Sequence, residues 1–338
     1  MSSLPAQVEW IRGTVAGRPG HRLMVVLAAP GCAWARRTGG CTNCGFAAAF
    51  GTSRPVSPAE LTAQLQEALR RIPAAEAGPV ELDLFCSGSF FNPDEIPASA
   101  QAELLRIGAA HPAVRSLLVE TRPEYATPER LGAARDACAG KALEIAIGLE
   151  SASPVLLSRI HKGFYFDDFA AAAARVAAAG LGLVVYVLQK PIDTREGEAL
   201  LDAVATIQRV FETGRELSLP TRVALEPCFV VPGTPLARAC DEGRYRPPWL
   251  WSVLAVLVHT HALGRIQVGL SDEGMSASHR PRNCERCSVR LRKALSEFNA
   301  SQRLSDLLAL DCGCRDEWLS EIAAEGLSPA NLSRGETP

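Results

Sequence analysis

The chain has 338 residues, which is enough for one α/β barrel and an appended segment. Its formal net charge of −2 gives no general attraction to nucleic acid, so such a partner would have to meet a local basic patch. No apolar run approaches the roughly 18 residues of a membrane-spanning helix, and residues 1–20 lack the apolar stretch of a signal peptide. We therefore expect a cytoplasmic protein without a membrane anchor.

Six apolar, β-branched runs alternate with helical stretches, as expected for strands that are covered on both faces. The predicted strands are Leu23–Ala29, Val80–Phe85, Ser116–Glu120, Leu143–Gly148, Leu183–Leu188 and Arg222–Glu226. Strands that alternate with helices predict a parallel sheet with right-handed crossovers. Six such units predict an α/β fold of the partial (β/α)6 TIM-like barrel type.

The intervening helices carry start signals. Ser57-Pro58-Ala59-Glu60 is a capping box with proline at the first helical position, and it predicts a helix to about Arg71. The later helices are predicted from Thr127-Pro128-Glu129 into Leu131–Cys138, from an Asp167 cap to Gly180, and over Glu196–Glu212.

The character of the sequence changes after Arg246. An apolar helix, Trp249–Leu263, is followed by a polar loop and a group of cysteines. We place a boundary here and predict a barrel over 1–246 and a C-terminal extension with a four-cysteine metal site over 247–338. The polar tail Leu327–Pro338 is expected to be frayed.

Eleven cysteines are many for a cytoplasmic protein, where they indicate metal ligands or buried small side chains rather than disulfides. Two groups stand out, and the remaining four, Cys86, Cys138, Cys228 and Cys240, are scattered. The first group is Cys32, Cys41 and Cys44. The second is Cys284, Cys287, Cys312 and Cys314.

The first group has the spacing Cys-x8-Cys-x2-Cys and follows the first predicted strand. This places three thiolates in the first βα loop, at the rim where barrel enzymes carry their chemistry. Gly39, Gly40 and Gly45 allow the backbone to fold tightly there. Three cysteines leave one iron of a [4Fe–4S] cluster open to a small molecule. The alternative is a zinc site completed by a fourth ligand from elsewhere.

The segment from Cys32 to Phe46, CAWARRTGGCTNCGF, resembles the cluster loop of the Elp3/MiaB-like radical S-adenosylmethionine (SAM) enzymes, although Cys-x3-Cys-x2-Cys is their commonest spacing. The chain is similar to the archaeosine-synthase radical SAM subunit (RaSEA) family over nearly its whole length. The likeness continues in Ser87–Asn92, Glu120–Glu124, Ile147–Ser151, Lys162–Phe164, Tyr186–Pro191 and Tyr245–Trp251.

This resemblance implies a [4Fe–4S] cluster on Cys32, Cys41 and Cys44, with SAM at its open iron. It implies reductive cleavage of SAM to methionine and a 5′-deoxyadenosyl radical, which takes a hydrogen atom from the substrate. In that family the radical acts on a lysine-bearing 7-deazaguanine in tRNA and cleaves the lysine side chain to leave an amidine. The expected partners are an electron donor of the flavodoxin or ferredoxin type and a transferase subunit.

Three alternatives remain open. One is a radical SAM enzyme that acts on a small molecule in specialised metabolism, and another is a methylthio- or carboxymethyl-type modification. The third is a non-catalytic Fe–S or zinc protein that binds RNA or a partner.

Three successive strand ends carry polar groups that suit SAM. They are Ser87, Gly88 and Ser89 after the second strand, Glu120 and Arg122 after the third, and Glu150 and Ser151 after the fourth. A carboxylate suits the ribose hydroxyls or the amine of SAM, and a guanidinium suits its carboxylate. The alternative for each residue is a solvated rim position or a structural ion pair.

Lys190 and Glu226 follow the fifth and sixth strands, and we assign them to catalytic work on the substrate. The alternative for Lys190 is an ion pair with a neighbouring acid. His161 lies in a loop, where a histidine is more often a surface or capping residue than a catalyst.

The second cysteine group supplies four ligands, and a closed structural zinc site is its first interpretation. An auxiliary iron–sulfur cluster is the alternative, and His279 could replace one cysteine. Basic residues surround the group: Arg280, Arg282, Arg286, Arg290, Arg292 and Lys293. They could contact tRNA phosphates, or they could form a solvated helix face near Glu285 and Glu297.

Overall fold

A computed structural model describes residues 4–52, 54–73 and 78–327. The strands are β1 Gln7–Val15, β2 Arg18–Val26, β3 Val80–Phe85, β4 Val114–Glu120, β5 Ala142–Glu150, β6 Gly182–Gln189, β7 Thr221–Pro227 and β8 Ile266–Val268. They form one sheet in chain order, and every neighbouring pair from β2 to β8 is parallel. The predicted partial barrel is thereby confirmed, with β2–β7 as its six units.

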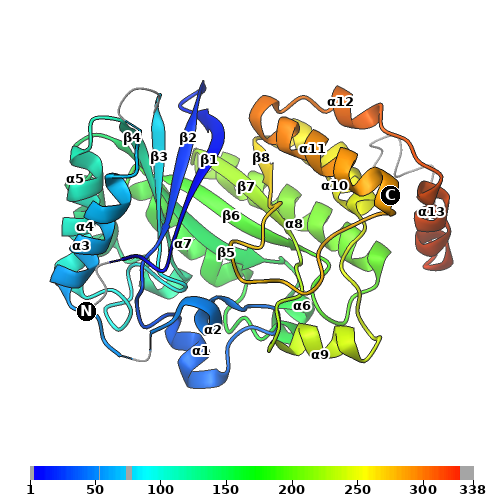
Figure 1. The fold of residues 1–338 in the computed structure, drawn as a ribbon, viewed down its shortest axis with the longest axis horizontal. Coiled ribbons are helices and arrows are strands. Elements are labelled where there is room, and N and C mark those ends of the chain that lie inside the picture. Colours follow the sequence, from blue (N-terminus) through cyan, green and yellow to red (C-terminus); the bar gives the residue numbers. More distant parts are fainter. Residues whose placement is uncertain (1–3, 53, 74–77, 328–338) are drawn as a thin grey trace.

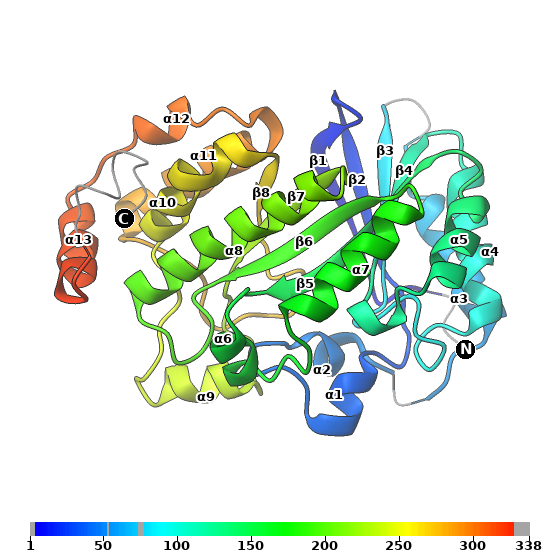
Figure 2. The same cartoon turned by 180° about the vertical axis from the view of Figure 1, so that it is seen from behind.

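The helices cover the outside of this sheet and its carboxyl edge. They are α1 Ala33–Thr38, α2 Phe46–Phe50, α3 Pro58–Leu69, α4 Ala98–Ala110, α5 Pro128–Ala137, α6 Pro154–Arg159, α7 Phe166–Ala178, α8 Glu196–Glu216, α9 Pro235–Asp241, α10 Leu250–Thr260, α11 Glu285–Ser301, α12 Ser305–Leu308 and α13 Cys314–Ala324, with short 3-10 turns at Pro123–Tyr125 and His261–Leu263. Figure 1 shows α1, α2, α6 and α9 gathered at the lower edge, and Figure 2 shows α7 and α8 lying across the outer face of the sheet.

The sequence missed two strands. β1 pairs antiparallel with β2 and forms one edge of the sheet, and β8 extends the other edge beside β7. β1 is interrupted by polar residues and half exposed, and β8 has three residues, so neither has the continuous apolar run of a buried strand. β2 also begins earlier than predicted, at Arg18, because it pairs with β1 along its full length, from Arg18 to Val26.

The helix starts follow their caps. Ser57 and Glu60 form the predicted capping box, and the Thr127 side chain accepts the N–H of Arg130. The Asp167 cap was wrong: α7 begins at Phe166, and the Asp168 carboxylate accepts the N–H of Tyr165 at 2.8 Å. The helix begins two residues earlier than predicted, because the Asp168 carboxylate reaches back to the free N–H of the cap residue Tyr165.

Strand alternation separates two apolar layers. Outward side chains such as Leu23 and Val25 pack under the helices, while Met24 and Val26 join Phe85 inside the barrel. A buried polar layer fills the amino-terminal end of the barrel. There Arg22 binds Asp83 at 2.5 Å and Glu81 at 3.1 Å, and Arg222 binds Glu81 at 3.0 Å and Glu144 at 2.6 Å. Since this end is filled, the remaining space opens at the carboxyl edge.

The boundary near residue 246 stays a prediction. The segment after it adds β8 to the sheet and packs α10 against α8. Residues 328–338, most of the tail expected to be frayed, lie outside the described residues. None of the described helices is long and apolar enough to cross a membrane.

Candidate active site

The three cysteines of the first group lie in the loop after β2 and line a cavity of about 250 Å³ at the carboxyl edge of the sheet. α1 starts directly after Cys32 and ends at Gly39 and Gly40, whose φ angles are 89° and 79°. Glycine adopts this left-handed backbone without a steric penalty. The turn brings the chain back so that Cys41 and Cys44 line the cavity that Cys32 also lines.

Two side chains outside this loop fix its backbone. The buried Glu95 carboxylate accepts the N–H of Ala33 at 2.9 Å and the N–H of Ser89 at 2.5 Å, so it joins the cysteine loop to the loop after β3. On the other flank, His161 Nδ1 lies 2.9 Å from the Gly40 carbonyl oxygen. The prediction of a non-catalytic role for His161 fits this anchoring contact.

Alternation along the strands delivers the acidic residues to the cavity. Glu120 follows the inward-facing Leu118 on β4, and Glu226 follows the inward-facing Ala224 on β7. On β5, Glu150 follows the inward-facing Ala146 and Gly148 at the same two-residue spacing; the register shifts between Gly148 and Glu150, and Glu150 has a left-handed φ of 72°. A strained backbone at the end of a strand is typical of functional sites.

Five of the seven residues predicted to hold SAM line the cavity: Ser87, Gly88, Glu120, Arg122 and Glu150. The other two serve the scaffold. The Ser89 hydroxyl accepts the N–H of Arg122 at 3.1 Å, and the Ser151 hydroxyl donates to Asp202 on α8 at 2.8 Å. Ser151 alternates with the inward-facing Glu150, whereas Ser89 lies in the loop after β3 and is held by its contact with Arg122.

Lys162 is a cavity residue that the sequence left unassigned. Its ammonium lies 2.7 Å from the Glu150 carboxylate, and it lines the same cavity as Cys41. Burial acts to lower the pKa of Lys162, but the Glu150 carboxylate raises it, and the net pKa lies above the usual value. The sequence signal that could have pointed to Lys162 was its place in the Lys162-Gly163-Phe164 motif.

Arg122 is held on an aromatic surface. Its guanidinium carbon lies 5.0 Å from the ring centroids of Trp34 and Phe164, and its Nε donates to Glu124 at 2.6 Å. Gly163 permits this packing, because a Cβ there would lie 2.4 Å from the Trp34 ring. The guanidinium is thus fixed in place at the cavity wall.

A second set of acids lines the cavity, and within the described part of the chain none of them forms an ion pair with a lysine or arginine. Burial and nearby Glu273 raise the pKa of Glu120 and of Glu226 to about 8, and burial raises the pKa of Glu273 to about 7. Glu273 comes from the polar segment after β8, where no pattern in the sequence pointed to it. These carboxylates favour a cationic ligand.

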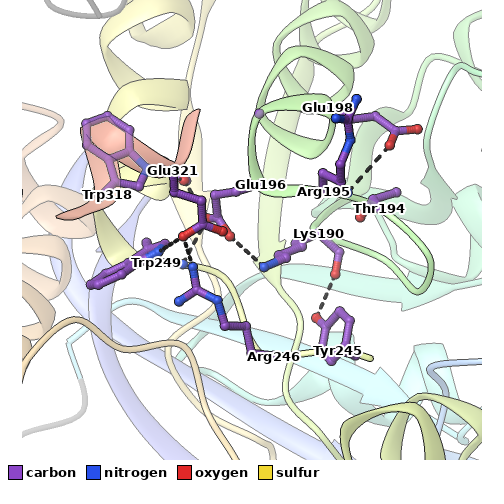
Figure 3. Close-up of polar contacts among 12 residues, drawn as sticks. Lys190, Thr194, Arg195, Glu196, Glu198, Tyr245, Arg246, Trp249, Trp318 and Glu321 are labelled. Carbon is purple, nitrogen blue, oxygen red and sulfur yellow. Dashed lines mark hydrogen bonds and ion pairs between the residues drawn. The ribbon is translucent and has the colours of Figure 1, made fainter. Parts of the chain in front are cut away.

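Lys190 lies away from the cavity lining. Figure 3 shows its ammonium directed at Glu196 on α8, at 2.6 Å, while its carbonyl oxygen accepts the Tyr245 hydroxyl at 2.7 Å. The structure therefore favours the ion-pair interpretation of Lys190 over a catalytic one, because its ammonium is buried against Glu196. Glu226, the other residue assigned to the substrate, does line the cavity.

The cavity fits an iron–sulfur cluster and SAM. Burial raises the pKa of the Cys41 thiol although the nearby Lys162 acts to lower it, so bound metal ions would have to draw off its proton. Ser87 is 6% exposed, and its hydroxyl has no hydrogen-bond partner in the described part of the chain. A buried orphan hydroxyl in a cavity indicates a missing polar ligand.

The second cysteine group forms a compact site. The Sγ atoms of Cys284, Cys287, Cys312 and Cys314 all lie within 4.8 Å of one another, with Cys284 at 3.6 Å from Cys287 and from Cys312. His279 is not among them and instead lies 3.8 Å from Cys240. Among the described residues no other three His, Cys, Asp or Glu side chains converge this closely. The first group is therefore spaced too widely to share one ion.

The chain has relatives among characterised proteins. It is 33% identical over 306 residues to archaeosine synthase subunit beta of Methanosarcina acetivorans, covering 90% of this chain and 85% of the relative. It is 31% identical over 307 residues to archaeosine synthase subunit beta of Thermococcus kodakarensis, covering 90% and 92%. No protein-family model matches the chain.

Solved structures share the fold at low sequence identity. Methylornithine synthase (PylB) aligns with a TM-score of 0.54 and 13% identity over 92% of this chain and 83% of that one. A radical SAM methyltransferase from Sphaerobacter thermophilus aligns with a TM-score of 0.50 and 16% identity over 81% and 80%. The two sequence relatives show that the chain belongs to the archaeosine synthase subunit beta family, and its fold is one that a radical SAM methyltransferase shares.

Proposed function

We propose that the chain is the radical-generating subunit of an archaeosine-type synthase. Its substrate is a lysine-bearing 7-deazaguanine nucleoside in tRNA, and its reaction cleaves the lysine side chain to leave an amidine, a lyase-type step. The observation that carries the proposal is the meeting of Cys32, Cys41 and Cys44 with Glu120, Arg122 and Glu150 in one cavity. The names of the two relatives support the choice of substrate.

Each cavity residue has a definite task in this proposal. Cys32, Cys41 and Cys44 would hold a [4Fe–4S] cluster, and together with SAM this cluster supplies a 5′-deoxyadenosyl radical for hydrogen-atom abstraction. Arg122 would bind the SAM carboxylate, while Glu120 and Glu150 would bind its amine or ribose hydroxyls. The Lys162 ammonium holds the Glu150 carboxylate in a fixed position at 2.7 Å.

We infer that the four C-terminal cysteines bind zinc. A tetrahedral zinc ion with bonds of about 2.3 Å separates its sulfur ligands by roughly 3.8 Å. Here the Sγ atom of Cys284 lies 3.6 Å from those of Cys287 and Cys312, and the Sγ atoms of Cys287 and Cys314 lie 3.4 Å apart. In a second iron–sulfur cluster each thiolate would bind a different iron, which spreads the sulfurs further.

The remaining components follow from the same proposal. A reduced flavodoxin or ferredoxin would supply the electron, and the word subunit in the relatives' names supports a partner transferase subunit. All eleven cysteines are free thiols, which supports a cytoplasmic location. A small-molecule substrate is the second candidate, because the net charge of −2 gives no general attraction to RNA.

The test is anaerobic reconstitution with iron and sulfide, followed by reduction in the presence of SAM. We expect 5′-deoxyadenosine to form, and Cys32→Ala, Cys41→Ala and Cys44→Ala each to abolish it together with the cluster absorbance. Cys138→Ala, a buried cysteine on α5's C-terminal side, is the matched control. tRNA that carries the lysine-bearing base should stimulate the reaction and be converted. Normal 5′-deoxyadenosine formation in the three variants would refute the radical SAM assignment of this loop.

A further inference from the structure

The eight residues between Cys32 and Cys41 do more than connect two metal ligands. Residues Ala33–Thr38 of this stretch form α1, which begins directly after Cys32. α1 carries one aromatic side chain, Trp34, which contacts residues 160–164, a segment between α6 and α7 that we call the strap. Because Trp34 belongs to the cysteine loop, each contact that it makes with the strap also fixes that loop.

The strap is tied to the cysteine loop by three polar contacts. The Trp34 Nε1–H donates to the His161 carbonyl oxygen at 2.9 Å. Thr42 donates its N–H to the Ile160 carbonyl oxygen at 3.0 Å, and His161 Nδ1 lies 2.9 Å from the Gly40 carbonyl oxygen. The indole and imidazole rings also pack against each other, with centroids 5.2 Å apart. Together these contacts hold the indole ring in one orientation.

Trp34 forms part of the surface on which Arg122 rests. The guanidinium carbon lies 5.0 Å from the centroid of the Trp34 ring and 5.0 Å from that of the Phe164 ring. One ring comes from the cysteine loop and the other from the strap, so the two segments meet at this cation. A cation over an aromatic face is attracted by the ring quadrupole, and the attraction grows when water is excluded. Since the Arg122 side chain is only 12% exposed, both rings contribute to its orientation.

The Arg122 guanidinium keeps one nitrogen for a ligand. Nε donates to the Glu124 carboxylate at 2.6 Å, and Nη1 donates to the Lys162 carbonyl oxygen at 2.9 Å. Nη2 forms no hydrogen bond with the described residues, and the side chain lines the cavity. A guanidinium that is fixed in this way presents its remaining donors in a set direction, which suits a carboxylate.

We propose that Trp34 is a positioning residue for recognition of the SAM carboxylate, and that it acts through Arg122. Trp34 is not one of the side chains that line the cavity, so it can influence a ligand there only through the residues that it holds. This inference rests on the proposed function, which supplies SAM and assigns its carboxylate to Arg122. The long cysteine loop then has a second role, because it carries the aromatic ring that orients this guanidinium.

The experiment measures binding of two ligands to the reconstituted enzyme without reductant, by calorimetry. The ligands are SAM and decarboxylated SAM, which keeps the amine and the sulfonium but lacks the carboxylate. The measured quantity is the preference, the affinity for SAM divided by that for decarboxylated SAM. Trp34→Ala should reduce this preference about tenfold, equivalent to about 1.4 kcal/mol, with the affinity for decarboxylated SAM within about twofold of wild type. Once Arg122→Ala is present, adding Trp34→Ala should lower the preference by no more than about twofold, because both changes remove the same contact.

Two further variants make the test specific. Trp34→Phe keeps a ring beside Arg122 and should hold the preference within about threefold of wild type. Trp10→Ala is the control, because Trp10 also stacks on a histidine, with ring centroids 4.5 Å apart, but lies on β1 and does not line the cavity. It should keep the full preference. Iron content and cluster absorbance should match the wild type in every variant.

Three results would overturn the inference: an unchanged preference in Trp34→Ala, an equal loss of both ligands in that variant, or a preference in Trp34→Phe as low as in Trp34→Ala. An equal loss would show that Trp34 only supports the loop. Formation of 5′-deoxyadenosine by the reduced wild type tests the proposed function in the same preparation. That assay can succeed while the preference fails to change, so this inference can fail alone, whereas a wild type that binds no SAM refutes both.

Discussion

At the scale of single residues, Glu95 shows how one buried carboxylate can fix two loops. It accepts N–H groups from Ala33 and Ser89, and Asn92 Nδ2 donates to it at 2.7 Å. Glycine is needed at position 88, because a Cβ there would lie 1.9 Å from Glu95 Oε2. Glu95 touches no reacting group and is a positioning residue for the cysteine loop.

We predict that Glu95→Gln loosens the cysteine loop. The amide replaces a carboxylate in charge-assisted hydrogen bonds worth about 1.5–3 kcal/mol each, and its NH2 group would face backbone N–H donors. Cluster absorbance should bleach faster in air and SAM affinity should fall about tenfold, while the thermal unfolding midpoint drops by a few degrees. Glu103→Gln, at a half-exposed acid on α4 that pairs with Arg106, should change none of these. A variant that only melts earlier, with normal cluster and SAM binding, would argue against positioning.

At the scale of elements, α8 and α13 are joined by one carboxylate. Glu325, just after α13, accepts the N–H groups of Glu196 at 3.1 Å, Gly197 at 2.9 Å and Glu198 at 3.3 Å. These are the free donors at the positive end of the α8 dipole. The C-terminal helix thus caps a helix of the barrel that lies far away in sequence.

Removing the Glu325 carboxylate should change the stability of the protein by a measurable amount. We expect Glu325→Ala to lower the free energy of unfolding by about 1–2 kcal/mol, from the lost capping bonds and dipole interaction. Urea denaturation followed by circular dichroism checks this value. Glu317→Ala, an exposed residue on α13, is the matched control. Equal stability of both variants would show that the α8–α13 contact contributes nothing in solution.

The ion pair between β6 and α8 belongs to the same scale. Glu196 also accepts the Trp249 N–H at 2.9 Å and the Ser252 hydroxyl at 2.5 Å, so it links Lys190 to α10 (Figure 3). Breaking a buried pair from one side typically costs about 3–5 kcal/mol. We predict that Lys190→Met destabilises the protein by that amount.

The folded fraction of Lys190→Met should still cleave SAM at a near-normal rate. The measurement is 5′-deoxyadenosine formation per folded enzyme at low temperature, with the folded fraction taken from circular dichroism. A large loss of substrate turnover in fully folded Lys190→Met would restore the catalytic assignment of this lysine.

At the scale of the whole molecule, two features bear on the role of the C-terminal region: the four-cysteine site and the row of cations on α11. α11 begins directly after Cys284 and α13 begins at Cys314, so one metal ion would tie the starts of two helices together. Trp251 of α10 donates to Cys314 Sγ at 3.3 Å, which connects this site to the helix packed on α8.

Metal analysis of anaerobically purified protein should find about one zinc and about four irons per chain. Cys314→Ser should lose the zinc and much of its solubility while the spectrum of the first cluster is kept. About eight irons without zinc would instead establish a second cluster at these cysteines.

α11 also presents a row of cations. Arg286, Arg290 and Lys293 are exposed and share one face of the helix, and Lys293 lies 3.9 Å from Glu297. If tRNA is the substrate, Arg286→Glu with Arg290→Glu should weaken tRNA binding at least tenfold and reduce the salt dependence of binding. SAM cleavage without tRNA should not change. Filter binding over a salt series measures this, and unaltered binding would remove α11 from the RNA interface.

The sequence by itself determined the barrel, its six central strands and the cysteine loop, because these depend on local signals. Continuous apolar runs mark strands buried on both faces, capping boxes mark helix starts, and cysteine spacing marks metal chemistry. Glu120, Arg122 and Glu150 could be predicted as cavity residues because the carboxyl ends of parallel strands meet at one edge of the sheet.

Only the tertiary structure decided which of these side chains face the cavity and what completes it. Ser151 and Lys190 also follow strands, but both bond to α8. Ser151 alternates with the inward-facing Glu150, whereas Lys190 has the inward parity of Tyr186 and Leu188 and leaves it where the backbone turns at a φ of 62°. Glu95, Lys162 and Glu273 reach the site from loops through contacts with residues distant in sequence. Such contacts leave no periodic pattern, because long-range closure of the barrel, and not local propensity, brings these residues together.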